Sequence, residues 1–250
     1  MVAVIIQARM GSTRLPKKVL LNLQGKSVLE HIINRVKKAK KIDKVIVATT
    51  IDKEDDRIAE LCEKIGIDYY RGSENDVLDR YYQAAKKFGF KNIIRITGDC
   101  PLIDPGVIDK VVELYEKENL DYATNIMPPT FPDGLDTEIF SFASLEKAWS
   151  EAKLKSNREH VTVYIWQHPD LFKQKHIKNE VDLSDKRWTL DNPEDYEFIK
   201  QVYDNLYSSK PDFKTEDILQ FLKANPEIEK INQGIKRNEG FEKSLNEDKL

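Results

Sequence analysis

The chain has 250 residues, of which 40% are apolar and 33% charged, a composition typical of globular proteins rather than of disordered or membrane proteins. The formal net charge of −3 argues against the overall basic field of a nucleic-acid-binding protein. No apolar run approaches the ~18–20 residues that cross a bilayer, and the N-terminus has no secretory signal pattern. Two cysteines, Cys62 and Cys100, form no disulfide framework, so we expect a cytoplasmic protein.

Strand and helix patterns alternate through the first hundred residues. Short apolar, β-branched runs predict buried strands at 2–8, 44–50, 67–70 and 92–97. Capping residues and terminal glycines predict helices at 27–40, 52–66 and 77–88. Ser73 and Asp76 form the capping box expected to open the third of these helices. This alternation predicts an α/β fold with a doubly wound, mainly parallel sheet.

The second half of the chain is less regular. It predicts strands at 120–125, 135–140 and 186–190, and helices from 105, from 144, at 157–167 and at 193–207. No composition break or internal repeat requires a second domain. We therefore predict one domain over 1–233, followed by a polar tail at 234–250 that frays.

A cationic loop follows the first predicted strand. Residues 9–18 of this loop carry four cations and no acid: Arg9, Arg14, Lys17 and Lys18. Arginine forks, lysine point charges and the backbone N–H groups freed by Gly11 are the donors that a triphosphate requires. A solvated charged surface is the alternative. Ligands bind beyond the carboxyl ends of the strands in open α/β sheets, and this position favours the binding site.

Two aspartates are expected at the same edge of the sheet. Asp99 follows the strand at 92–97, and Asp191 follows the strand at 186–190. Because Mg²⁺ is usually held by one or two carboxylates together with substrate phosphates, we expect these side chains to bind Mg²⁺. The structural alternatives are a turn aspartate for Asp99 and a helix cap for Asp191.

Other polar residues are weaker candidates. Asp133, Asp136 and Glu138 form an acidic group suited either to sugar hydroxyls or to simple solvation. His160 is the one histidine in a polar setting, next to Arg158 and Glu159, although a single helical histidine is more often structural.

Two common phosphate-binding motifs are absent from the sequence. Gly25-Lys26-Ser27 resembles the end of a P-loop, but Leu20 stands where that motif requires glycine. No G-x-G-x-x-G follows the first strand, which disfavours a dinucleotide-binding Rossmann domain.

Several motifs together resemble the cytidylyltransferases that activate acidic sugars, the 3-deoxy-manno-octulosonate and acylneuraminate enzymes, and more closely their spore-coat polysaccharide branch. The resemblance spans about Val2 to Ile199 and rests on segments that recur in order: 6–16 with Lys18, 71–73, 77–81, 97–102, 133–136, 158–162 and 189–191. One departure is Lys17, which stands where many relatives have glycine.

The resemblance implies a three-layer α/β/α sandwich of the glycosyltransferase-A type and a CTP-dependent reaction with Mg²⁺ as cofactor. It implies a nucleotide-binding half at 1–118 and a sugar-binding half at 119–233 that could also form a homodimer. Lys18, Arg14 and Asp99 are the expected catalytic residues, and Asp99 and Asp191 the expected metal ligands. The expected nucleotide-binding residues are Ala8, Arg9, Gly11, Ser12, Arg14, Lys18, Arg71, Ser73 and Asp99, and the expected sugar-binding residues are Asp136, Glu138 and His160.

The reaction predicted from these residues is transfer of CMP from CTP to a sugar or sugar acid, with release of pyrophosphate. A sugar-1-phosphate nucleotidyltransferase that uses another nucleotide is one alternative. A nucleotide-sugar-dependent glycosyltransferase is another, although the Asp-x-Asp tripeptide usual in that class is absent. A non-catalytic carbohydrate-binding module would have no use for the cationic loop and the strand-end aspartates together.

Overall fold

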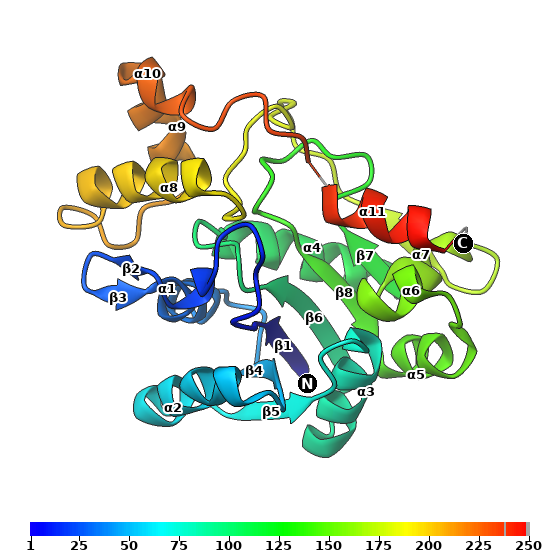
Figure 1. The fold of residues 1–250 in the computed structure, drawn as a ribbon. Coiled ribbons are helices and arrows are strands. Elements are labelled where there is room, and N and C mark those ends of the chain that lie inside the picture. The colour runs from blue at the N-terminus through cyan, green and yellow to red at the C-terminus, as the bar shows by residue number, and fades with distance from the viewer. Residues whose placement is uncertain (238, 249–250) are drawn as a thin grey trace.

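The computed structural model describes residues 1–237 and 239–248, apart from the side chain of Lys243. Its centre is a seven-stranded sheet in the order β5-β4-β1-β6-β8-β7-β9 (Figure 1). β5, β4, β1 and β6 are parallel, whereas β8 runs antiparallel to both of its neighbours. The prediction of a mainly parallel sheet is confirmed.

The strands are short, and most lie where the apolar runs predict them. The strands of this sheet are β1 (Val2–Gln7), β4 (Lys44–Thr50), β5 (Tyr69–Gly72), β6 (Asn92–Thr97), β7 (Tyr122–Thr124), β8 (Glu138–Ser141) and β9 (Gln174–His176). A separate two-stranded ribbon consists of β2 (Asn22–Leu23) and β3 (Lys26–Ser27).

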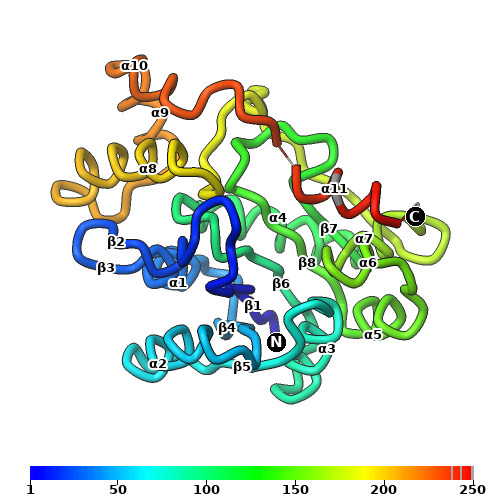
Figure 2. Tube along the Cα trace, in the orientation of Figure 1, coloured from blue at the N-terminus to red at the C-terminus, as the bar shows by residue number. Residues whose placement is uncertain are grey.

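Helices cover both faces of the sheet and complete the predicted three layers (Figures 1 and 2). One face packs against α1 (Val28–Val36), α2 (Asp56–Ile65), α4 (Pro105–Glu118), α8 (Pro193–Leu206) and α9 (Thr215–Ala224). The other packs against α3 (Val77–Phe88), α5 (Phe142–Glu151) and α7 (Val163–Gln167). The remaining helices are α6 (Lys155–Glu159), α10 (Pro226–Glu229), α11 (Glu239–Glu247) and the 3-10 turns η1 (Lys18–Leu20) and η2 (Lys53–Asp55).

The sequence of β1 explains why it lies at the centre. Val4 and Ile6 point into the core under α1 and α4, and Ala3 and Ile5 point into the core under α3. All four side chains are fully buried. Apolar residues on both faces are what a strand between two helix layers requires.

Several predicted helix-capping residues are confirmed. The Ser27 side chain accepts a hydrogen bond from Glu30 N (3.2 Å), and Gly66 and Gly89 end their helices in the left-handed conformation. The cap of α3 differs from the prediction, because the side chain of Asp76, not that of Ser73, caps this helix.

The predicted strand at 186–190 is wrong. Arg187 forms only an isolated bridge with Asp133, and the segment then binds the backbone of Asp99 rather than a sheet ladder. The segment also passes very close to Gly134. Glycine permits this contact, since a Cβ at position 134 would lie 2.6 Å from the carbonyl carbon of Trp188. β9, a short polar edge strand, was not predicted because its sequence has no apolar alternation.

The predicted helix at 157–167 is two helices. α6 and α7 are separated at Val161, which has a φ of 61°. Its side chain is fully buried beneath the sheet, so packing holds a β-branched residue in a conformation that it rarely adopts.

The predicted polar tail is ordered where the structure describes it, which corrects the expectation of fraying. Residues Glu239–Glu247 form α11, which packs against α6, and the Asp248 side chain accepts a hydrogen bond from Ser156 N (3.0 Å). Residues 238, 249 and 250 of the predicted tail lie outside the described residues.

Candidate active site

A cavity of about 1060 Å³ opens at the carboxyl ends of β1 and β6. The chain crosses from one side of β1 to the other at this point, since β4 and β5 lie on one side and β6 on the other. Such a change of direction is where open α/β sheets bind ligands. The walls come from the cationic loop, the segment 74–80, the turn after β6, the segments 126–138 and 155–166, Thr189 and Asp191, and the segments 236–237 and 239–247.

The cationic loop is anchored by a buried carboxylate. Asp55 accepts hydrogen bonds from Met10 N (2.7 Å) and from the Thr50 hydroxyl, and only 2% of Asp55 is exposed. The loop then turns back on itself, because Ser12 N and Lys17 N both donate to the carbonyl of Met10. Lys17 adopts the left-handed conformation, with φ 61° and ψ 21°. Lys18 consequently points into the cavity from the start of η1.

Lys18 lies between the two strand-end aspartates. Its Nζ is 2.9 Å from Asp99 Oδ2 and 2.7 Å from Asp191 Oδ1. Burial alone would lower the pKa of Lys18, but the two carboxylates outweigh burial and raise it. Burial would raise the pKa of Asp99, yet Lys18 and the Thr97 hydroxyl lower it to about 2. Lys18 and Asp99 are therefore both charged at neutral pH.

Two short backbone contacts hold Asp99. Gly98 N donates to Gln7 O (2.8 Å), and a Cβ at Gly98 would lie only 2.8 Å from that oxygen. Leu190 N donates to the carbonyl of Asp99 (2.8 Å), which brings the next residue, Asp191, alongside. Glycine at position 98 therefore lets the end of β6 lie against β1.

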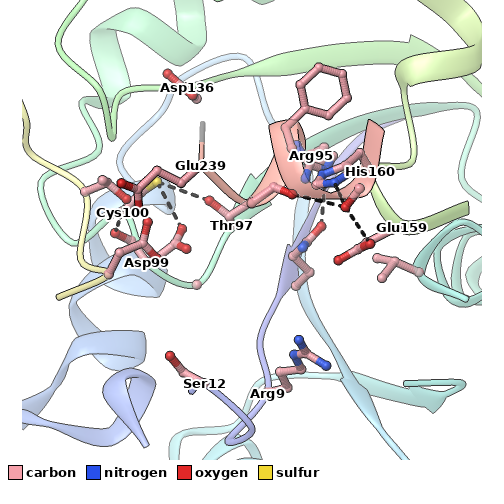
Figure 3. Close-up of a pocket in the computed structure, with 18 of the residues that line it drawn as sticks. Arg9, Ser12, Arg95, Thr97, Asp99, Cys100, Asp136, Glu159, His160 and Glu239 are labelled. Atoms are coloured by element: carbon pink, nitrogen blue, oxygen red, sulfur yellow. Dashed lines mark hydrogen bonds between the residues drawn. The ribbon is translucent and has the colours of Figure 1, made fainter. Parts of the chain in front are cut away.

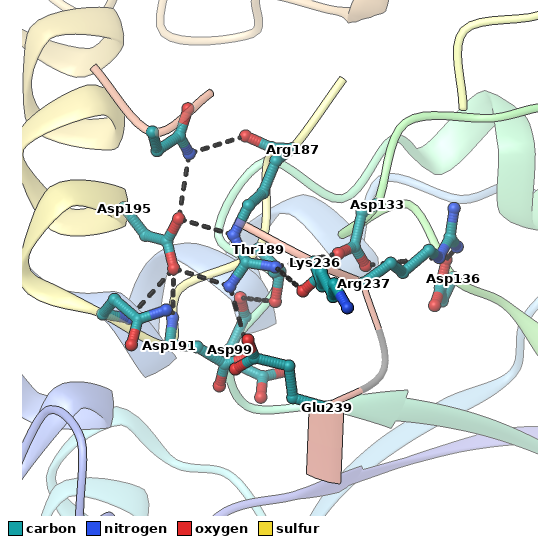
Figure 4. A network of polar contacts seen from close by, with 12 residues as sticks. Asp99, Asp133, Asp136, Arg187, Thr189, Asp191, Asp195, Lys236, Arg237 and Glu239 are labelled. Atoms are coloured by element: carbon teal, nitrogen blue, oxygen red, sulfur yellow. Dashed lines mark hydrogen bonds and ion pairs between the residues drawn. The ribbon is translucent and has the colours of Figure 1, made fainter. Parts of the chain in front are cut away.

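Asp191 is positioned by a buried cluster centred on Asp195 (Figure 4). Asp195 is fully buried and accepts hydrogen bonds from Asp191 N (3.0 Å) and Asn192 N (2.9 Å). Nε and Nη2 of Arg187 each lie 2.8 Å from one of its oxygens, and Asn232 Nδ2 donates at 2.9 Å. Burial alone would raise the pKa of Asp195, but these donors lower it.

The two arginines of the cationic loop are also paired. Arg14 lies 3.0 Å from Asp191 Oδ2 and 2.6 Å from Glu239 Oε2, so it joins the site to the first residue of α11. Arg9 lies 2.8 Å from Glu74 Oε1 on the opposite wall. Ala8, Gly11 and Ser12 also line the cavity. The loop residues expected to bind nucleotide therefore all lie on its wall.

Arg71 and Ser73, by contrast, lie outside the cavity wall. Arg71 donates to the carbonyls of Thr50 and Asp52 and pairs with Asp56 at 2.6 Å. The Ser73 hydroxyl accepts from Asp76 N in the turn before α3. The structure does not bring these two side chains together with the rest of the predicted nucleotide site.

The acidic group divides between two environments. Glu138 is buried and bound by Arg95 (2.5 Å), Tyr122 (2.6 Å) and Thr162 (2.5 Å). Asp136 pairs with Arg237 at 2.6 Å, and burial raises the pKa of Asp136 to about 7 although Arg237 opposes that shift. Both residues line the cavity, as does His160, whose Nε2 lies 3.0 Å from Ser244 Oγ (Figure 3).

Comparisons with known proteins give the family. A model of the family described as cytidylyltransferase matches residues 3–223. This chain belongs to the cytidylyltransferase family.

Three proteins illustrate the similarity. A solved cytidylyltransferase of Leptospira borgpetersenii serovar Hardjo-bovis is 39% identical, with a TM-score of 0.87 and coverage of 94% of this chain and 99% of that one. The spore coat polysaccharide biosynthesis protein SpsF of Bacillus subtilis is 35% identical, with coverage of 89% and 94%. A 3-deoxy-manno-octulosonate cytidylyltransferase of Elusimicrobium minutum is 38% identical over 53% of each chain. The resemblance inferred from the motifs is confirmed.

The cytidylyltransferase site suits a hard cation held partly by its substrate. Asp99 and Asp191 converge on one point, since both lie within 3 Å of Lys18 Nζ. Among the described residues, no group of three or more His, Cys, Asp and Glu side chains is arranged to hold a metal ion. Two carboxylates completed by phosphate oxygens and water match the preference of Mg²⁺, so the residues present fit this ion.

Sequence reasoning missed several residues of the cytidylyltransferase cavity. Arg95 lines the cavity and donates to Gln7 Oε1 (3.1 Å), and its signal was an arginine between the isoleucines of β6. Asp195 could only be recognised as a helix-capping residue, because its contact with Arg187 depends on the fold. Glu239, Phe241 and Ser244 lie in the segment expected to fray.

None of the helices in the described part of the chain combines the length and the apolar character needed to cross a bilayer.

Proposed function

We propose that this cytidylyltransferase transfers CMP from CTP to a hydroxyl group of a sugar or sugar acid and releases pyrophosphate. The observation that carries the proposal is the convergence of Lys18, Asp99 and Asp191 at the carboxyl edge of the sheet. The acceptor oxygen forms a bond to the α-phosphorus, the bond from that phosphorus to the bridging oxygen breaks, and the hydroxyl proton passes to solvent. Positioning and charge neutralisation dominate such a transfer.

The residues of the cationic loop would bind and orient the nucleotide. Arg14 and Lys18 stabilise the charge that moves onto pyrophosphate, and Arg9, the backbone N–H of Gly11 and the hydroxyl of Ser12 bind the remaining phosphate oxygens. Asp99 and Asp191 would hold Mg²⁺, which would supply positive charge to neutralise the phosphates.

The acceptor would lie in the same cavity as the nucleotide. Asp136, Glu138 and His160 line this cavity and remain the candidates for contact with the sugar. Similarity to a spore coat polysaccharide protein supports a role in making surface polysaccharide. The cytoplasmic location and the homodimer expected from the sequence stay predictions.

The first experiment measures pyrophosphate release with each nucleoside triphosphate against 3-deoxy-manno-octulosonate, N-acetylneuraminate and a set of sugar 1-phosphates. Turnover with CTP and a sugar or sugar acid supports the proposal. Turnover of a sugar 1-phosphate with another nucleotide would instead favour the sugar-1-phosphate nucleotidyltransferase. Loss of turnover on addition of EDTA, with recovery in Mg²⁺, tests the metal separately.

A binding experiment separates this reaction from glycosyl transfer. CTP with Mg²⁺ should raise the melting temperature more than CDP at equal concentration, because the cationic loop is suited to a full triphosphate. A ligand at a hundred times its dissociation constant stabilises the fold by about 2.7 kcal/mol. Lys18→Ala should greatly reduce the shift. Greater stabilisation by CDP or a nucleotide sugar would favour the glycosyltransferase, and no shift with any nucleotide would favour a binding module.

A further inference from the structure

The last described helix forms part of the cavity wall, although it lies beyond the span that the family model matches. That match ends at residue 223, whereas Phe241 and Ser244 of α11 line the cavity. α11 is held there by its contacts with α6, including an ion pair between Lys155 and Glu247. The cavity therefore has a wall that lies outside the part of the chain matched by the family model.

Aromatic rings gather on this wall. The ring of Phe241 lies edge-on to that of His160, with the centroids 5.1 Å apart, and 6.1 Å from that of Trp166. All three side chains are partly exposed and line the cavity. Phe241 of α11 therefore lies beside the rings of His160 and Trp166, which belong to the segment that contains α6 and α7.

Hydrogen-bonding groups lie among these rings. The Ser244 hydroxyl donates to Glu159 Oε2 (2.8 Å), and His160 Nε2 lies 3.0 Å from the same hydroxyl oxygen. Burial lowers the pKa of His160, so its ring is neutral at pH 7. We refer to Glu159, His160, Trp166, Phe241 and Ser244 as the aromatic wall.

The chemistry of the aromatic wall differs from that of the cationic loop. Its formal charge is negative, because Glu159 is its one charged member, so it offers phosphate groups no attraction. Apolar ring surfaces next to a carboxylate and a hydroxyl match a sugar ring, whose C–H groups form apolar faces and whose hydroxyls donate and accept at the rim. Figure 3 shows His160 and Glu159 across the cavity from Asp99 and Cys100.

We propose that the aromatic wall is the subsite for the sugar ring of the acceptor, and that α11 thereby determines which acceptor is used. Phe241 and Trp166 pack on the ring, and Ser244 and Glu159 bind its hydroxyls. The inference rests on the proposed function, because it needs an acceptor sugar in the same cavity as CTP.

The test uses the full chain and three single variants. Phe241→Leu removes the aromatic ring but keeps an apolar side chain, and Ser244→Ala removes the hydroxyl. Asn246→Ala, at an exposed position of the same helix, is the control. Each is assayed with CTP and whichever of 3-deoxy-manno-octulosonate and N-acetylneuraminate the wild type turns over. The dissociation constant of CTP is measured in parallel by calorimetry.

We expect Phe241→Leu and Ser244→Ala each to raise KM for the sugar by roughly fivefold to tenfold, as the loss of one aromatic or polar contact does. Their CTP dissociation constants, and both constants of Asn246→Ala, should stay within about twofold of wild type, since these changes leave the cationic loop intact. If Phe241→Leu fails to fold, Ser244→Ala still tests the inference.

An unchanged KM in a folded variant would overturn the inference and leave the proposed function standing. Equal weakening of CTP and sugar binding would overturn it too, because α11 would then serve the nucleotide. If the wild type turns over neither sugar with CTP, the proposed function fails in its sugar-acid form and the inference fails with it.

Discussion

Lys17 has a backbone conformation that favours glycine. It adopts a φ of 61°, a conformation that costs most residues about 1–2 kcal/mol relative to the right-handed region. Its side chain is exposed, so packing does not repay this strain. Lysine at position 17 therefore leaves backbone strain in the cationic loop.

Lys17→Gly should stabilise the protein by about 0.5–1 kcal/mol. The glycine relieves the backbone strain, but part of that gain is lost because glycine loses more conformational entropy on folding. Lys17→Ala is the matched control, because it removes the charged chain and retains the strain. Urea denaturation of both variants measures the difference. A glycine variant no more stable than the alanine variant would contradict this account.

His31 makes the stability of the fold depend on pH. Its Nε2 donates to the carbonyl of Leu23 (2.7 Å), and its ring packs against Tyr203 and Tyr207. Burial lowers the pKa of His31 from 6.5 to about 4, although the hydrogen bond to Leu23 opposes the shift. The unfolded chain therefore binds a proton more readily between pH 6.5 and 4.

The free energy of unfolding should fall as pH is lowered through this window, with a contribution from His31 of the order of 2–3 kcal/mol. Above pH 6.5 that contribution is fully present. His31→Gln keeps a donor for Leu23 but cannot be protonated, so its unfolding free energy should vary less between pH 7 and 4. Parallel pH profiles of the two proteins would rule out this role.

At the scale of elements, the segment 187–191 owes its place to Arg187 and Asp195. Both side chains are almost fully buried, and they are joined by two hydrogen bonds of 2.8 Å. The same carboxylate also accepts hydrogen bonds from the backbone N–H groups of Asp191 and Asn192, just before α8. Loss of Asp195 would leave the Arg187 charge buried without its main partner.

Asp195→Asn should lower the free energy of unfolding by about 3–5 kcal/mol, the usual cost of breaking a buried ion pair. Asp204→Asn, which breaks the exposed pair of Asp204 with Lys200 on the same helix, should cost less than about 1 kcal/mol. Urea denaturation compares them. Similar losses in both variants would show that burial of the first pair is not what matters.

The elements that the sequence predicted correctly are those determined by local patterns. Apolar runs such as 2–8 and 92–97 must be buried wherever they lie, and the cap at Ser27 depends only on its neighbours. The path of 186–190 depends instead on distant partners, the backbones of Asp99 and Asp133.

The same distinction applies to the candidate site. The cationic loop and Asp99 stood out because they follow strongly patterned strands. Of the aromatic wall, His160 was predicted to contact the sugar. Phe241 and Ser244 were missed, because they lie in a polar segment that becomes ordered only by packing on α6. Nothing within that segment indicated such a partner.

At the scale of the whole molecule, an ion pair joins the cationic loop near the start of the sequence to α11 near its end. Arg14 and Glu239 are 225 positions apart and lie 2.6 Å from each other. The Glu239 carboxylate thus contacts a guanidinium that the proposed function assigns to phosphate. Nucleotide and α11 compete for the same cation.

Glu239→Gln should therefore lower the dissociation constant of CTP by about twofold to fivefold, in keeping with the modest strength of exposed ion pairs. Glu242→Gln, on an exposed position of the same helix, removes an equal charge away from Arg14 and should leave CTP binding unchanged. Calorimetric titration of both variants measures the effect. Weaker binding by Glu239→Gln would show that this carboxylate helps to hold the nucleotide.

The pairing of each phosphate-binding cation with a carboxylate has a thermodynamic consequence. Arg9, Arg14 and Lys18 are all in ion pairs, so a triphosphate that recruits them releases carboxylates, among them Asp99 and Asp191. On the proposed mechanism, those carboxylates are then free to bind a divalent cation. Affinities for nucleotide and cation must rise together, each increasing the other by the same factor. The protein would thus distinguish a magnesium–nucleotide complex from the free nucleotide before any bond is made.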